Sequence, residues 1–262
     1  MRRILPAVMS QLLLFTLFST VCVPQPVSTH HKQGSGHAFL TLRSTDGKVL
    51  AVGEALIVSH GTSVVSRLTF NFRDGSLDDD ITVFKQNGCL HLLSDHHIQK
   101  GPSFPHPVDI LVDVSKAQVT LHSPETGKDT SEHMEMPSDL ANGLLPQVLQ
   151  NIDPAAEQTK VSYVAPGSRP RIVELDITPD GDDIFTIAGT HHRAHRLKIN
   201  VELGGMAGLV APILGKEPKA SYVWVTVGKV PVFLRLQAQF YEGGPIWNVE
   251  QASPVWPSSI ER

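Results

Sequence analysis

The strongest constraint on the fold of this chain is a repeated alternation of apolar and polar residues. Leu68, Phe70 and Phe72 alternate with polar neighbours, which is the period of a strand with one buried face. The dipeptides Asp74-Gly75 and Asn87-Gly88 follow strand-like runs and favour tight hairpins. The sequence therefore predicts antiparallel meanders. The other strand-like runs cover residues 81–86, 108–114, 173–177, 197–203, 222–227 and 232–240.

A single helical segment is expected between these runs. Ser138-Asp139 offers an N-cap, Pro146 is expected to kink the helix, and Asp153-Pro154 is expected to end it. A long antiparallel sheet must curl to bury its apolar side. We therefore expect a mainly β fold, an antiparallel barrel or half-barrel wrapped around one central helix at about residues 138–152. The apolar face of that helix consists of Leu140, Leu144, Leu145, Val148, Leu149 and Ile152.

The N-terminus has the layout of a secretory signal peptide. Arg2 and Arg3 precede an almost uncharged run from Ile4 to Val23. Thr20-Val21-Cys22 is a passable cleavage triplet, so we expect cleavage between Cys22 and Pro26 and an exported protein, periplasmic or secreted. The alternative is an uncleaved inner-membrane anchor, because about 20 apolar residues suffice to cross a bilayer.

These features divide the chain into four parts. Residues 1–25 are the expected signal peptide, 26–36 a flexible leader, 37–250 a single β-rich domain, and 251–262 a C-terminal tail. A hydrophobic content of 41% with 18% charged residues is ordinary for a globular protein. The net charge of −4 becomes −6 when the two signal arginines are removed. We expect no nucleic-acid partner, because such binding needs basic residues.

The cysteines and histidines give no metal or catalytic signature. Cys89 would be alone after signal cleavage, in an apolar context typical of a small buried residue. His191 and His195 are four residues apart, about 13 Å on a strand, too far to share one ion. His96 and His97 are adjacent, so on a strand they point to opposite faces. We therefore predict no catalytic residue, no metal and no cofactor.

Acidic residues gather beside predicted turns. Residues 176–181 start like a calcium loop, but the twelfth position is Ile187 where a bidentate Glu is needed. We interpret residues 78–80 and 182–183, all aspartates, as solvated carboxylates flanking turns. We therefore expect these acidic residues to belong to turns and to bind no ion.

The segment 204–215 is uncharged and rich in small residues. As a helix it would span about 18 Å, too short for a bilayer core of roughly 30 Å. We interpret it as a buried plug at one end of the barrel. The alternative is a lip that makes peripheral membrane contact.

Two parts of the sequence resemble a group of uncharacterised exported bacterial proteins. The first runs from Leu68-Thr69-Phe70-Asn71-Phe72-Arg73-Asp74-Gly75 through residues 99–105, and the second from Val201-Glu202-Leu203-Gly204-Gly205 through residues 216–218. The resemblance implies export and a bacterial origin, and no catalytic residue. The expected architecture is similar to half-barrel periplasmic proteins of the lipoprotein-carrier type, which is a likeness of fold alone.

The expected function is non-catalytic binding of a hydrophobic or amphipathic, lipid-like ligand in a cavity of the barrel. The first alternative is a structural or protein-interaction module of the cell envelope, with the cavity filled by the helix and residues 204–215. The second is a metal-dependent or serine-type hydrolase.

Three residues are the candidate ligand-binding site, which we call the histidine strip: His191, Arg193 and His195. On one continuous strand they share a face with Leu197 and the apolar residues that follow it. The strip would then form the polar mouth of the cavity, with Arg193 contacting an anionic head group. The alternative interpretation is a strand that emerges from the core into solvent.

Overall fold

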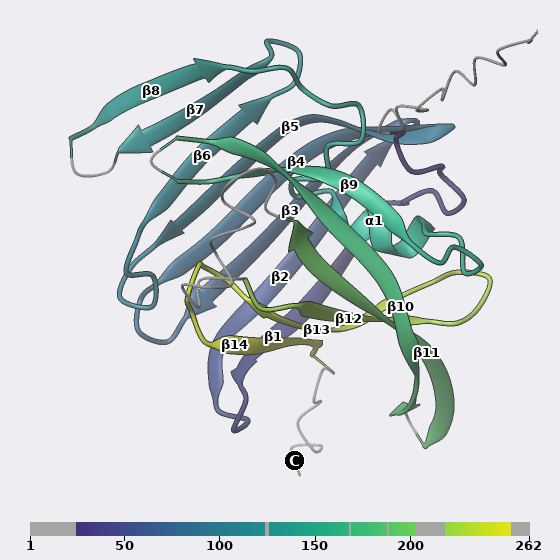
Figure 1. The fold of residues 1–262 in the computed structure, drawn as a ribbon. Coiled ribbons are helices and arrows are strands. Elements are labelled where there is room, and N and C mark those ends of the chain that lie inside the picture. Colours follow the sequence, from purple (N-terminus) through teal and green to yellow (C-terminus); the bar gives the residue numbers. More distant parts are fainter. Residues whose placement is uncertain (1–24, 124–125, 168, 188, 203–217, 253–262) are drawn as a thin grey trace, which may run out of the picture.

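One antiparallel sheet makes up most of the fold (Figure 1). The computed structural model describes residues 25–123, 126–167, 169–187, 189–202 and 218–252. Its elements are β1 (Gly36–Ser44), β2 (Val49–His60), β3 (Ser63–Phe72), β4 (Leu77–Asn87), β5 (Cys89–Lys100), β6 (Val108–Asp113), β7 (Gln118–Ser123), β8 (Lys128–His133), α1 (Leu145–Asn151), β9 (Thr159–Ala165), β10 (Arg171–Ile187), β11 (Thr190–Glu202), β12 (Ser221–Thr226), β13 (Phe233–Gln239) and β14 (Ile246–Gln251).

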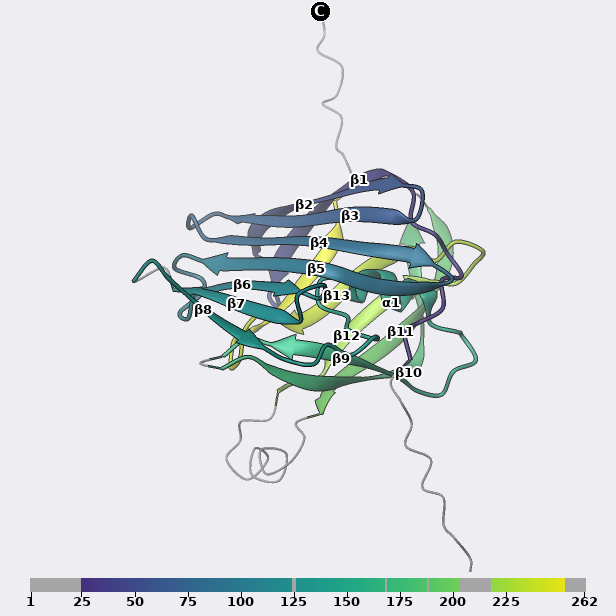
Figure 2. The same cartoon turned by 90° about the horizontal axis from the view of Figure 1, so that it is seen from above.

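The sheet consists of two meanders, β1–β8 and β9–β14. They join where β1, the first strand in the chain, pairs with β14, the last. The strand order is β8-β7-β6-β5-β4-β3-β2-β1-β14-β13-β12-β11-β10-β9. Leu42 of β1 lies opposite Val249 of β14, and both are buried. The sheet curls so that β4–β7 and β9–β12 contribute to one apolar core with α1 between them (Figure 2). The predicted antiparallel half-barrel around one helix is confirmed.

The helix is shorter than the sequence predicted. The expected helix covered residues 138–152, whereas α1 begins at Leu145 and is preceded by turns. The predicted N-cap at Ser138-Asp139 and the predicted kink at Pro146 are wrong, because Leu144 is the N-cap and Pro146 lies in the first turn. Proline fits there because the first helical N–H groups have no partner within the helix.

Residues 139–151, which we call the plug segment, fill the interior of the half-barrel. Leu140, Ala141, Leu144 and Val148 are all buried in the core shared by the two walls. The plug segment therefore takes the place of a cavity in this part of the barrel. The segment 204–215, which we expected to be a second plug, lies outside the described residues.

Aromatic residues form a second core at the end of the sheet where β13 turns into β14. Trp247 lies 5.4 Å from Phe72 and 6.0 Å from Phe104, measured between ring centroids. Phe240 and Tyr241 complete the cluster at 5.3 and 6.1 Å from Trp247. These rings join the β3–β4, β5–β6 and β13–β14 connections, which are distant in sequence.

The aspartates at positions 78–80 correct one interpretation. We expected solvated carboxylates beside a turn, but all three lie inside β4, and Asp78 and Asp79 are buried. The preceding turn is short, so the strand begins at Leu77. Three consecutive acids hide the apolar alternation on which the sequence interpretation relied.

No helix among the described residues has the length and hydropathy of a membrane span.

Candidate functional site

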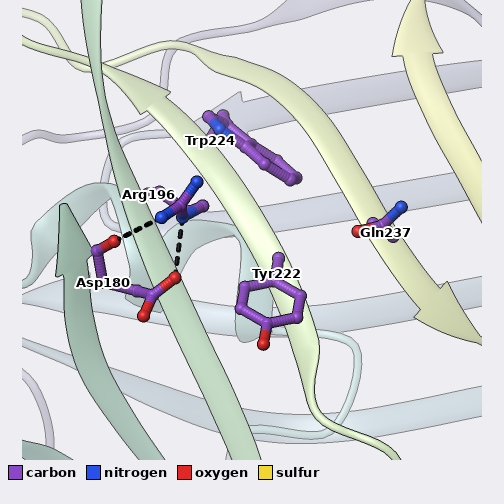
Figure 3. A pocket seen from close by; sticks show the side chains of 5 residues that line it. All are labelled: Asp180, Arg196, Tyr222, Trp224 and Gln237. Atoms are coloured by element: carbon purple, nitrogen blue, oxygen red, sulfur yellow. Dashed lines mark hydrogen bonds and ion pairs between the residues drawn. The ribbon is translucent and has the colours of Figure 1, made fainter. Parts of the chain in front are cut away.

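A shallow pocket lies on the outer face of β10–β13 (Figure 3). Its volume is about 280 Å³, and five side chains line it: Asp180, Arg196, Tyr222, Trp224 and Gln237. Arg196 of β11 lies opposite Trp224 of β12, and Tyr222 lies opposite Gln237 of β13. A β-bulge in β10 places Asp180 beside Arg196. The sheet register therefore assembles this outer pocket from four strands.

Charge pairs fix the side chains of the outer pocket. The Arg196 guanidinium donates to the Asp180 carboxylate at 2.7 Å and to the Asp183 carboxylate at 3.2 Å. Trp224 Nε1 donates to the same Asp183 oxygen at 2.7 Å, and the Arg235 guanidinium lies 5.3 Å from the Trp224 ring centroid. Two carboxylates and two guanidinium groups thus surround the Trp224 ring and balance in charge.

The outer pocket was not predicted from the sequence. Its five lining residues include no serine, cysteine, histidine or lysine, and the carboxylate of Asp180 is paired with Arg196. Tyr222 and Trp224 sit two apart on one strand, and this spacing was the one available signal that their rings share a face. Their polar partners on β10 and β13 follow only from the pairing of the strands.

The structure places the whole histidine strip on β11. Its face is the opposite one to the outer pocket, because His195 and Arg196 are adjacent on the strand. The strip leads from exposed residues at the hairpin end to the buried side chains of Leu197 and Ile199. The predicted phase is therefore confirmed as far as Val201, and Leu203 lies outside the described residues.

Local contacts orient the histidine strip. Asp182 accepts from His195 Nδ1 at 2.5 Å and lies 3.7 Å from the Arg193 guanidinium. His191 Nδ1 is 3.1 Å from Thr186 Oγ1. The 3.7 Å contact exceeds hydrogen-bond length, and the Arg193 side chain is 61% exposed. Arg193 is thus accessible to a ligand.

Aliphatic side chains flank Arg193 on the same face. Ile184 lies opposite Arg193 in β10 and is 75% exposed. On the other side, the Val227 backbone N–H donates to the Arg193 carbonyl at 2.9 Å, and Val227 is also exposed. An exposed guanidinium between two exposed aliphatic residues makes this end of the sheet amphipathic.

A second polar group lies inside the half-barrel on the facing strands β4 and β5. We call it the interior polar cluster, and it consists of Asp78, Asp80, Thr82, Asp95, His97 and Gln99. Cross-strand pairing sets Asp78 opposite Gln99, Asp80 opposite His97, and Thr82 opposite Asp95. His97 Nε2 is 3.0 Å from Asp78 Oδ1, and Gln99 Nε2 donates to Asp78 Oδ2 at 3.1 Å.

The surroundings shift the pKa values of this cluster. Burial raises the pKa of Asp95 well above its usual range, and the charge of Asp80 raises it further. Burial also raises the pKa of Asp80, partly offset by contacts with Asp95 and His97. Burial opposes the charge on His97, but Asp78 outweighs it and the pKa of His97 is raised. Asp80 and Asp95 therefore retain protons to higher pH than exposed carboxylates do.

The described residues contain no group of three or more His, Cys, Asp or Glu side chains placed to hold a metal ion. His96 and His97 take opposite faces of β5, as predicted, since they contact Asp109 and Asp78 respectively. Cys89 is half-buried and forms no disulfide.

The sequence matches no protein-family model, and the search of curated proteins gave no match. A β-barrel-like protein of Domain of Unknown Function DUF1849 from Brucella abortus has 7% sequence identity to this chain and a TM-score of 0.48, covering 86% of this chain and 99% of that chain. The hypothetical lipoprotein YmcC from Escherichia coli has 10% identity and a TM-score of 0.36, covering 85% of this chain and 86% of that chain. These similarities concern shape, and they assign this chain no ligand, partner or activity.

Proposed function

We propose that this protein is an exported, non-catalytic binding protein for an amphipathic, lipid-like ligand. The observation that carries the proposal is Arg193, an exposed guanidinium set between the exposed aliphatic side chains of Ile184 and Val227. A guanidinium pairs well with a phosphate or carboxylate head group. The flanking aliphatic residues suit the first methylene groups of an acyl chain.

The ligand belongs at the rim of the half-barrel in this proposal. The plug segment packs into the interior, so the apolar residues around α1 already have partners. The histidine strip instead offers a continuous face that is polar at its exposed end and apolar toward Leu197. Export is supported by the signal-like sequence of residues 1–25.

Sedimentation with lipid vesicles tests the proposal. Vesicles of phosphatidylglycerol supply an anionic head group, and vesicles of phosphatidylcholine supply the same acyl chains without net charge. We expect Arg193→Ala to weaken binding to the anionic vesicles about fivefold, since a basic residue at an anionic surface contributes about 1 kcal/mol. Its melting temperature should be unchanged, because the side chain is mostly exposed.

Two further variants separate the head-group contact from general effects. Arg73→Ala removes an exposed arginine beside the β3–β4 turn, away from β11, and should leave vesicle binding unchanged. Ile184→Ser should weaken binding to both kinds of vesicle, because it removes apolar contact without changing charge. Equal losses in Arg193→Ala and Arg73→Ala, or no binding of the wild-type protein to either vesicle, would overturn the proposal.

A further inference from the structure

Two carboxyl groups share one hydroxyl group inside the half-barrel. Thr82 Oγ1 lies 3.1 Å from Asp80 Oδ1 and 3.2 Å from Asp95 Oδ1. A threonine hydroxyl has one proton to donate, so it satisfies only one of these acceptors at a time. Asp95 is buried, which excludes water as a general substitute. Two ionised carboxylates in this position would therefore compete for this one hydroxyl donor and repel each other.

The plug segment presses directly against this carboxyl pair. A Cβ atom built on Gly143 would lie 2.1 Å from Thr82 Oγ1, 2.2 Å from Asp95 Oδ1 and 2.8 Å from Asp80 Oδ1. A Cβ atom essentially never lies within 3.0 Å of such neighbours. The backbone at Gly143, with φ of +55°, is thus in close contact with β4 and β5.

The same segment is tied to the opposite wall by hydrogen bonds. The Ala141 N–H donates to the Ser162 carbonyl of β9 at 2.9 Å. The Asn142 side chain accepts from the Val164 N–H at 2.7 Å and donates to the Val164 carbonyl at 2.9 Å. Residues 141–143 therefore bridge the wall that contains β4–β5 and the wall that contains β9. Repulsion between Gly143 and the carboxyl pair would therefore push the two walls of the half-barrel apart.

The other titratable groups around the pair come from three strands. Asp78 on β4 and His97 on β5 contact each other and form one ion pair beside it. Tyr163 on β9 feels both carboxylates, and burial raises its pKa, so it stays neutral. Asp79 also acts on His97 through its charge, but it faces Arg67 on the outer side of the sheet. None of these groups supplies a second positive charge to Asp80 and Asp95.

We propose that Asp80 and Asp95 form a proton-dependent latch that holds the plug segment at Gly143. With one proton on the pair, one acid donates to the other and Thr82 serves the remaining acceptor. Loss of that proton to solvent leaves two adjacent carboxylates under the plug segment. The contact at Gly143 then opens so that water reaches both groups, and α1 separates from β4–β5.

The direction of the pH dependence follows from burial. Burial raises the pKa of both Asp80 and Asp95 relative to the unfolded chain. Groups with a raised pKa stabilise the closed form below their unfolded pKa, and this stabilisation is lost as the pH rises through the raised pKa. The latch therefore closes at low pH and opens as the medium becomes alkaline. It does not depend on the ligand proposed above.

Amide hydrogen exchange measured by mass spectrometry tests the latch. Rates at about pH 6 and about pH 9 are corrected for the intrinsic pH dependence of exchange, and peptides of the plug segment are compared with peptides of β2. We expect plug-segment protection to be lost at the higher pH, about tenfold for each pH unit between the lower pH and the raised pKa of the closed form, because only the closed form holds the proton in that range. Protection in β2 should stay constant.

Single substitutions identify the responsible groups. Asp95→Asn cannot ionise, and its amide can donate to Asp80, so the plug segment should stay protected at both pH values. Asp129→Asn removes an exposed carboxylate on β8 and should keep the wild-type response. If Asp95→Asn does not fold, Asp80→Asn removes the same repulsion and replaces it in the test. Constant wild-type protection, or a pH response that survives in the folded Asn variant, would overturn the latch.

Discussion

Replacing Gly143 with alanine tests how tightly the plug segment packs against the interior polar cluster. The structure implies two separate costs. A Cβ in the left-handed region, here at φ of +55°, costs about 1–2 kcal/mol. Overpacking a buried site costs about 1–3 kcal/mol more, and the new methyl would lie 2.1 Å from Thr82 Oγ1. We therefore expect Gly143→Ala to lower the free energy of unfolding by roughly 2–5 kcal/mol.

Gly61→Ala is the matched control for this substitution. Gly61 has φ of +65°, close to that of Gly143, and a Cβ there would meet nothing within 4 Å. It should therefore lose only the conformational cost of about 1–2 kcal/mol. Urea unfolding followed by circular dichroism measures both values. Tight packing at Gly143 is refuted if the two variants lose the same free energy.

Two further substitutions test the contacts around the plug segment and on the outer sheet. Asn142→Ala should destabilise the protein by roughly 2–4 kcal/mol in urea unfolding, because it leaves both buried backbone groups of Val164 without partners; a loss below that of an exposed alanine substitution would contradict this. Burial opposes the charge of Asp79, but hydrogen bonds led by Arg67 outweigh it, so the pKa of Asp79 is lowered and its stabilisation is lost as the pH falls. Arg67→Ala should therefore move the midpoint of acid unfolding to higher pH, whereas Arg73→Ala should not.

The strands could be predicted because their signals are local. The alternation at Leu68, Phe70 and Phe72 marks β3, and Gly75 and Gly88 both adopt positive φ at the turns where the sequence placed them. These features depend on a few neighbouring residues. The pairing of β1 with β14 joins residues about 200 positions apart and has no local signal. The pairing that closes the sheet therefore could not be predicted from the sequence.

The histidine strip and the carboxyl pair differ in the same way: the first has a local sequence signal and the second does not. The histidine strip could be placed on one face because a strand has a period of two, and β11 confirms that phase. The carboxyl pair could not be found in this way, because Asp80 and Asp95 belong to different strands and meet only through the register of β4 and β5. A run of three aspartates instead favoured a turn. The outer pocket was missed for the same reason, since its residues come from four strands.

The helix α1 begins later than predicted because the residues before it cover an open edge of the sheet. The sheet ends at β8 and β9, and a free strand edge must be paired or covered. Residues 140–142 cover the edge of β9, and a chain that bonds to a strand edge cannot be helical there. Asn142 supplies the bonds to β9, and Gly143 allows the close approach to the opposite wall. Asn142, which is polar, and Gly143, which has no side chain, interrupt the apolar helical pattern. The helix α1 therefore begins only after them.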